Sequence, residues 1–185
     1  MVLSACSQGP PAAAPIPPHA KRTTGTAADS LNGIPGHAFG EPLRNFPGLV
    51  LAQKADETGV RWYRMPAGQE RGWLGQYADY ASISYQFQDG RFSMFRAVTS
   101  GLKGNPTALR DEALALFGPG NDPHDRMGGL DWNGERVRAM YSEKRTPPVT
   151  CWLEVHSKPV IAVQQAKEEA KLLAQMQAAE AAGQP

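Results

Sequence analysis

Asp122, His124 and Asp125 lie within four consecutive residues and form the group of side chains best suited to holding a divalent cation. Carboxylate and imidazole groups are common ligands of such ions. Pro123 stiffens this segment, however, and no second cluster of ligands accompanies it. Asn, Asp and Pro are also typical of a polar loop that follows a helix. We therefore interpret residues 121–125 as a loop with three candidate metal ligands, and we expect no metal and no other cofactor.

A glycine-rich segment at residues 68–80 carries the aromatic side chains Trp73, Tyr77 and Tyr80. Aromatic residues on such loops bind sugars, peptides or lipid headgroups in many proteins. The alternative is that Trp73 and Leu74 pack beneath the edge of a sheet and close the core, which is the more common role. We favour packing, but Trp73, Tyr77 and Tyr80 are the residues that we predict to contact a ligand if one binds.

Cys151 is a candidate nucleophile only if its thiol is exposed and a base lies beside it. Cys151 alternates in phase with Leu153 and Val155, which is typical of a half-buried strand and places the thiol on its apolar face. His156 belongs to the opposite face of that strand. We predict that Cys151 is a buried, unreactive thiol, and we assign no catalytic residue.

The run Arg61-Trp62-Tyr63-Arg64 mixes basic and aromatic residues, as surfaces that bind single-stranded nucleic acid do. In a strand, however, Trp62 and Tyr63 point to opposite faces and cannot form one stacking platform. The net charge of the chain is +1, whereas nucleic-acid-binding proteins carry a basic excess. We predict no nucleic-acid partner.

Composition narrows the function classes further. The chain has 185 residues, of which 41% are hydrophobic and 20% charged, as expected for one globular domain. Two cysteines are too few for a disulfide-rich scaffold or a four-cysteine zinc site. The sequence holds no nucleophile elbow, no H-E-x-x-H zinc motif and no phosphate-binding glycine loop. Nothing in the sequence therefore favours an enzyme, although an enzyme is not excluded.

Residues 3–6, Leu-Ser-Ala-Cys, match the lipobox of bacterial lipoproteins, in which the cysteine receives a diacylglycerol group after signal-peptide cleavage. No basic segment and no full apolar segment precede Leu3. A segment rich in Pro and Ala follows, and it has too few large apolar side chains to pack. We predict lipidation at Cys6. Ser7 after the cysteine predicts the periplasmic side of the outer membrane, by the sorting rule of Gram-negative lipoproteins.

Four segments follow from this pattern. Residues 1–6 are the remnant of a lipoprotein signal, 7–33 a disordered linker, 34–157 an α+β domain, and 158–185 a C-terminal helix and tail. We expect residues 158 to about 173 to dock on the domain through an apolar stripe that includes Ala162, Ala166 and Leu173, and the remainder to fray.

The domain pattern consists of hairpins and a few helices. Asp89-Gly90 predicts a two-residue turn between strands at 83–88 and 91–96, with Phe87, Phe92 and Met94 on the buried face. Asn105-Pro106 predicts the start of a helix that ends at Gly118-Pro119.

A second hairpin turn is expected at Asn133-Gly134, strands at 49–54, 60–65 and 149–155, and a short helix at 41–46. This order predicts an antiparallel sheet with one packed amphipathic helix and one long C-terminal helix.

Two stretches, Ile34-Pro35-Gly36 and Phe46-Pro47-Gly48-Leu49, resemble the opening of small uncharacterised bacterial exported proteins. The strand pattern at residues 83–92 and the helix end at residues 116–118 are similar to the same family. This resemblance implies an α+β domain of unknown function, and it carries no catalytic residues to transfer.

The leading hypothesis is a non-enzymatic envelope lipoprotein, tethered to the membrane through Cys6, whose domain binds an envelope protein or a small ligand. One alternative is an envelope hydrolase or transferase with a site near residues 68–80 or 121–125. Another is a soluble, exported binding protein whose cysteine carries no lipid.

Overall fold

The computed structural model describes residues 25–53, 59–66, 68–69, 72–77, 79, 81–121 and 128–183, and the structural statements below refer to these residues. Several predicted site residues lie outside them: Cys6, Tyr80, Asp122, His124 and Asp125.

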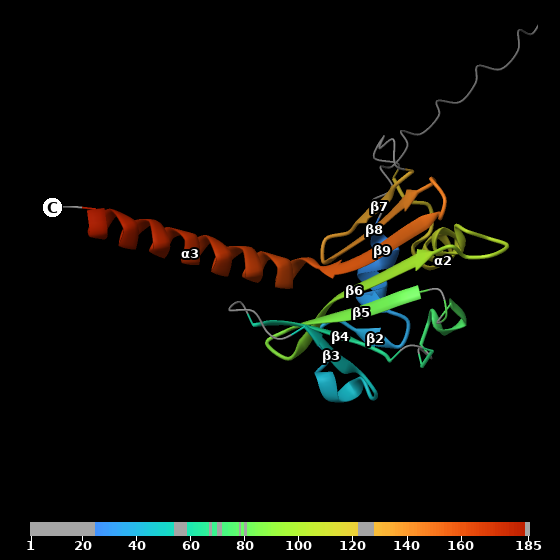
Figure 1. Cartoon of the computed structure of the whole chain (residues 1–185), viewed down its shortest axis with the longest axis horizontal. Helices are drawn as coiled ribbons and strands as arrows, with labels where there is room; N and C mark the ends of the chain where they lie inside the picture. Colours follow the sequence, from blue (N-terminus) through green and yellow to red (C-terminus); the bar gives the residue numbers. More distant parts are fainter. Residues whose placement is uncertain are drawn as a thin grey trace, which may run out of the picture.

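Figure 1 shows a twisted sheet with helices on one side and one long helix that leaves its end. In chain order the elements are α1 (Thr26–Leu31), β1 (Gly33–Ile34), β2 (His37–Ala38), η1 (Leu43–Asn45), β3 (Val50–Gln53), β4 (Val60–Arg64), η2 (Gly75–Tyr77), β5 (Ala81–Gln88), β6 (Arg91–Ser100), α2 (Ala108–Phe117), β7 (Leu130–Asn133), β8 (Val137–Lys144), β9 (Thr150–Ser157) and α3 (Lys158–Gly183).

Seven strands form one antiparallel sheet in the order β3-β4-β5-β6-β9-β8-β7, and β1 and β2 form a separate two-stranded hairpin. The predicted α+β class is confirmed. The core lies on one face of the large sheet, where the side chains alternate inward along each strand. Its largest fully buried members include Trp132, Tyr141, Phe87, Phe92 and Phe95. The first turns of α3 lie against one end of the other face, beside Gln86 and Met94, and no other described helix or strand covers it; it is called the open face below.

The β5–β6 hairpin has the predicted turn but a different register on its second strand. Asp89 and Gly90 adopt φ angles of 49° and 76°, as a type I′ turn requires. Phe87 pairs with Phe92, but Gln86 pairs with Met94, so Ser93 is an extra residue that forms a β-bulge. The prediction that Met94 shares the buried face of Phe92 is therefore wrong. Met94 lies on the open face.

Two predicted turns form differently in the structure. The helix expected at Asn105-Pro106 begins later, at Ala108, and the Asn105 side chain accepts the Thr107 backbone N–H at 3.2 Å in the turn before it. The two-residue turn expected at Asn133-Gly134 does not form there, because Asn133 still pairs with Arg138 in the sheet and residues 134–136 connect the two strands.

The predicted linker extends too far toward the domain. Residues 25–33 form α1 and the start of β1, and the Ala28 side chain is fully buried. Both Asp29 carboxylate oxygens accept backbone hydrogen bonds from residues 135–137, at 2.6–2.8 Å. The folded domain therefore includes residues 25–33, which lie before the predicted boundary at residue 34.

The C-terminal helix forms as predicted, but it does not dock as predicted. α3 projects away from the sheet (Figure 1). The side chains of residues 165–180 are exposed, and Leu173 is 57% exposed. Only its first turns contact the domain, where Gln164 donates to Gln88 at 2.8 Å and Lys167 to Asp89 at 3.0 Å. The stripe that contains Ala162, Ala166 and Leu173 is exposed to solvent.

Candidate functional site

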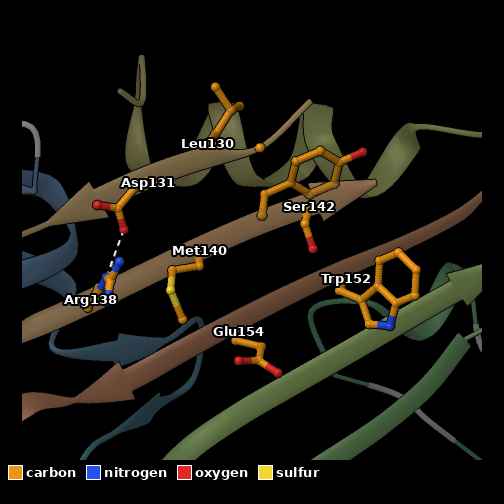
Figure 2. A pocket seen from close by; sticks show the side chains of 9 residues that line it. Leu130, Asp131, Arg138, Met140, Ser142, Trp152 and Glu154 are labelled. Atoms are coloured by element: carbon orange, nitrogen blue, oxygen red, sulfur yellow. Dashed lines mark hydrogen bonds and ion pairs between the residues drawn. The ribbon is translucent and has the colours of Figure 1, made fainter. Parts of the chain in front are cut away.

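The open face of the sheet carries rows of polar and aromatic side chains that the antiparallel register places side by side. Arg96 on β6 pairs with Glu154 on β9, and Glu154 pairs with Met140 on β8. The next row contains Val98, Trp152 and Ser142. Residues directly opposite each other on neighbouring strands lie within contact distance, so these side chains form one continuous surface. Figure 2 shows those from β7, β8 and β9.

Two hollows lie on this face and meet at Glu154. The larger, of about 510 Å³, lies over β7, β8 and β9, and its lining includes Asp131, Arg138, Met140 and Trp152 (Figure 2). The smaller, of about 300 Å³, extends over β5, β6 and β9 to the first turns of α3. Together they cross five neighbouring strands, a span of about 19 Å at about 4.8 Å per strand. A groove of this length suits an extended ligand.

Glu154 contacts two other polar side chains of the groove, Arg96 and His156. Its carboxylate accepts a hydrogen bond from Arg96 Nε at 2.6 Å and lies 3.1 Å from His156 Nε2. The hydrogen bond with His156 and the charge of Arg96 hold the pKa of Glu154 below its usual range. Arg96 also lies over the Trp62 ring, with 5.1 Å between the guanidinium carbon and the ring centre. Glu154 is therefore ionised and held in one orientation.

A second ion pair lies at the other end of the groove. Arg138 Nε donates to Asp131 Oδ1 at 2.9 Å (Figure 2). Met140 and Trp152 supply apolar surface between the two ion pairs and are only partly exposed. Each arginine is matched by one carboxylate, so the lining presents many donors and acceptors without an excess of either charge. Such a surface can hold a polar, uncharged ligand that also has an apolar face.

Two of the loop aromatics predicted to contact a ligand, Trp73 and Tyr77, contact Glu112 on α2. Trp73 Nε1 and the Tyr77 hydroxyl both donate to the Glu112 carboxylate, each at 3.1 Å. Burial and the nearby Glu112 raise the pKa of Tyr77. Leu74 is 1% exposed, which matches the packing role considered for this segment. Trp73 still lines a small cavity on the core side of the sheet.

Cys151 lies in the core, as expected from its alternation with Leu153 and Val155. Its side chain is fully buried, and burial raises the pKa of its thiol. The Tyr141 hydroxyl lies 3.2 Å from the sulfur and donates to Glu143 at 2.7 Å. Burial opposes ionisation of Glu143, but hydrogen bonds from Tyr141 and Arg145 outweigh it and lower its pKa. This cluster stabilises buried polar groups and offers no activated nucleophile.

The predicted metal ligands Asp122, His124 and Asp125, and the predicted ligand contact Tyr80, lie outside the described residues. Within the part of the chain that the structure describes, no three His, Cys, Asp or Glu side chains come together as a metal site would require.

The open-face residues were not singled out by their sequence. Arg96, Glu154 and Arg138 are far apart along the chain, and only strand order brings them together. One signal was available, because Trp152, Glu154 and His156 alternate with the buried residues of their strand. Tryptophan is enriched at interfaces, because its ring is apolar and its N–H can reach a polar partner, so Trp152 on the polar face was a hint of a binding surface.

Comparison of the chain with protein-family models, with curated proteins and with solved structures found no match. None of the helices in the described residues is both long enough and apolar enough to cross a membrane.

Proposed function

We propose that this protein is a non-enzymatic binding module of the bacterial envelope, and that the groove on the open face binds an uncharged oligosaccharide. The observation that carries the proposal is the groove around Glu154, where two arginine–carboxylate pairs flank the apolar surface of Trp152 and Met140. A sugar ring has one face of C–H groups that packs on tryptophan and a rim of hydroxyls that pair with charged planar side chains.

Charge and shape favour this ligand class over others. An anionic ligand would have to compete with Glu154 and Asp131 for the arginines, and a cationic ligand would have to compete with Arg96 and Arg138 for the carboxylates. A purely apolar ligand would bury four charged groups without replacing their hydrogen bonds to water, which costs free energy. A neutral, hydroxyl-rich chain avoids both costs.

The Leu-Ser-Ala-Cys sequence and the Pro- and Ala-rich segment after it support a lipid anchor at Cys6. In this proposal the lipid inserts into the periplasmic leaflet of the outer membrane, and residues that follow Cys6 link it to the domain. A diacylglycerol carries two acyl chains, and two chains hold a protein stably at a membrane surface without a spanning helix.

Titration calorimetry with chitotetraose, a neutral tetrasaccharide, tests the groove. We expect a Kd below about 1 mM, which corresponds to about −4 kcal/mol. Trp152→Ala should weaken binding about tenfold, because it removes the aromatic surface on which a sugar ring packs. The deacetylated tetramer, which has the same backbone but carries amino groups, should bind more weakly because the groove offers no excess negative charge.

Trp73→Ala is the matched control, since Trp73 is also a partly exposed tryptophan but lies outside the groove. It should leave the affinity for chitotetraose unchanged. Equal affinities for wild type and Trp152→Ala, or loss of binding in Trp73→Ala alone, would show that the open face is not the site. Chromatography of the incubated sugar tests the enzyme alternative, and conversion of chitotetraose into other products would favour that alternative.

A further inference from the structure

A smaller cavity lies on the core side of the sheet, between the β1–β2 hairpin, η1 and the segment around Trp73. Its volume is about 230 Å³, and four of its lining residues carry aromatic rings: His37, Phe46, Trp73 and Tyr85. This volume exceeds that of a cavity of about 150 Å³ that admits benzene. It is smaller than pockets of about 300 Å³ and more that hold drug-sized molecules. The cavity therefore suits one compact organic group.

Packing holds these rings in place before any ligand arrives. The His37 and Phe46 rings stack with 3.9 Å between their centroids. Phe46 meets Tyr85 edge-on at 5.8 Å, and both residues are 6% exposed. Trp73 packs against Phe95, with 5.8 Å between ring centroids, and its indole N–H is bonded to Glu112 on α2. A rigid aromatic wall loses little conformational freedom when it binds a ligand.

Two carboxylates contact the rings that line this cavity. Glu41 Oε2 lies 3.2 Å from His37 Nδ1, and Glu41 Oε1 accepts the Ala38 backbone N–H at 2.8 Å. The Ala38 N–H and the His37 ring hold the pKa of Glu41 below its usual range, so Glu41 is ionised at neutral pH. The Glu112 carboxylate accepts the Trp73 indole N–H at 3.1 Å. None of the residues that line the cavity is Lys or Arg.

We propose that this aromatic cavity binds a small quaternary ammonium group, of the chemical class that choline and betaine carry. Such a group has methyl surfaces, which suit an apolar lining, and a diffuse positive charge, which is attracted to the faces of aromatic rings. It has no N–H donors, so it needs no hydrogen-bond acceptors in the wall. A primary ammonium would lose its hydrogen bonds to water on entering this cavity.

Titration of the full chain with two matched small molecules tests this site. Choline and 3,3-dimethylbutan-1-ol have the same shape, but a carbon atom replaces the charged nitrogen in the second. We expect choline to bind about tenfold more tightly, because only choline gains the attraction between the cation and the rings. Trp73→Leu should weaken choline binding about tenfold while changing the affinity for the alcohol less than about threefold.

Trp152 lies on the opposite face of the sheet, so the Trp152→Ala variant should bind choline as the wild type does. This variant separates the two proposals, because it should lose affinity for chitotetraose alone. Equal affinity of the wild type for choline and 3,3-dimethylbutan-1-ol would overturn the cation site, as would the absence of choline binding up to the highest concentration tested. Both outcomes are measured on the wild type, so they hold even if Trp73→Leu fails to fold.

Discussion

At the scale of single residues, Asp29 shows how one carboxylate joins two distant parts of the chain. Its oxygens accept the backbone N–H groups of Glu135, Arg136 and Val137, and the Arg136 guanidinium donates to its backbone carbonyl at 2.9 Å. These partners lie more than 100 residues away in the sequence. A sequence pattern that reads only local spacing cannot detect such a contact. The predicted linker, residues 7–33, therefore includes Asp29.

Asp29→Ala should destabilise the domain by about 2 kcal/mol, because it leaves three backbone donors without their charged acceptor. Chemical denaturation measures this change in the free energy of unfolding. Glu135→Ala is the control, since the Glu135 side chain is exposed and only its backbone N–H contacts Asp29. It should stay within about 0.5 kcal/mol of the wild type. An Asp29→Ala variant as stable as this control would contradict the bridging role.

The loss of stability in Asp29→Ala should also depend on pH. Burial opposes the charge of Asp29, but its backbone hydrogen bonds outweigh burial and lower its pKa below the usual range of an aspartate. A lowered pKa stabilises the fold above the unfolded pKa, and this stabilisation is lost as the pH falls through the folded value. The stability difference between wild type and Asp29→Ala should therefore shrink below about pH 4.

At the scale of elements, the sequence predicts a turn correctly when the turn's shape depends only on its own residues. Asp89-Gly90 fixed a hairpin because its two φ angles select one turn type. The bulge at Ser93 could not be predicted, because the alternation of polar and apolar residues over 91–96 does not mark an extra residue. The Ser93 hydroxyl donates to the Gln86 carbonyl at 3.1 Å, a contact that exists only once the strands have paired.

The Phe87 and Phe92 pair tests the core face of that hairpin. The two rings lie 5.8 Å apart between centroids and are no more than 1% exposed. Either residue changed to Ala should lower the free energy of unfolding by about 3–5 kcal/mol, because the cavity cannot collapse fully. Arg61→Ala, opposite Phe87 on β4 but exposed, should change it by less than about 0.5 kcal/mol. Costs below about 1 kcal/mol for both phenylalanines would contradict this packing.

The length of α3 was predictable from its helix-forming residues, but its docking was not. Propensity depends on each residue alone, whereas docking needs an opposing apolar surface. The sheet end offers Gln88 and Asp89, which bond Gln164 and Lys167 on the polar side of the helix. The apolar side chains of Val163, Leu172, Leu173 and Met176 consequently remain exposed.

At the scale of the whole molecule, the fold class followed from the order of strands and helices, but the candidate site did not. Hairpins and helix ends are local, so they can be recognised one at a time. The groove requires β6 to pair with β9, which joins Arg96 to Glu154 across 58 residues. Before that pairing is known, Trp152 and Arg138 are ordinary polar-face residues of separate strands.

The proposed lipid anchor also concerns the molecule as a whole. Expressed in a Gram-negative bacterium behind a lipoprotein signal sequence, the protein should fractionate with membranes, and Cys6→Ala should appear in the soluble fraction. Cys151→Ala removes the other cysteine and should remain with the membranes. Mass spectrometry of the membrane form should show an acylated residue 6. Identical fractionation of wild type and Cys6→Ala would rule out the anchor.

The most direct test of the central claim is a map of the residues that respond to a bound sugar. Backbone amide NMR spectra of ¹⁵N-labelled protein, recorded with increasing chitotetraose, provide this map together with the indole signals of Trp62 and Trp152. The open-face account predicts shifts clustered on Arg96, Met140, Trp152 and Glu154, with little change around Trp73. Shifts confined to the segment of Trp73 and Tyr77, or no shifts at all, would contradict it.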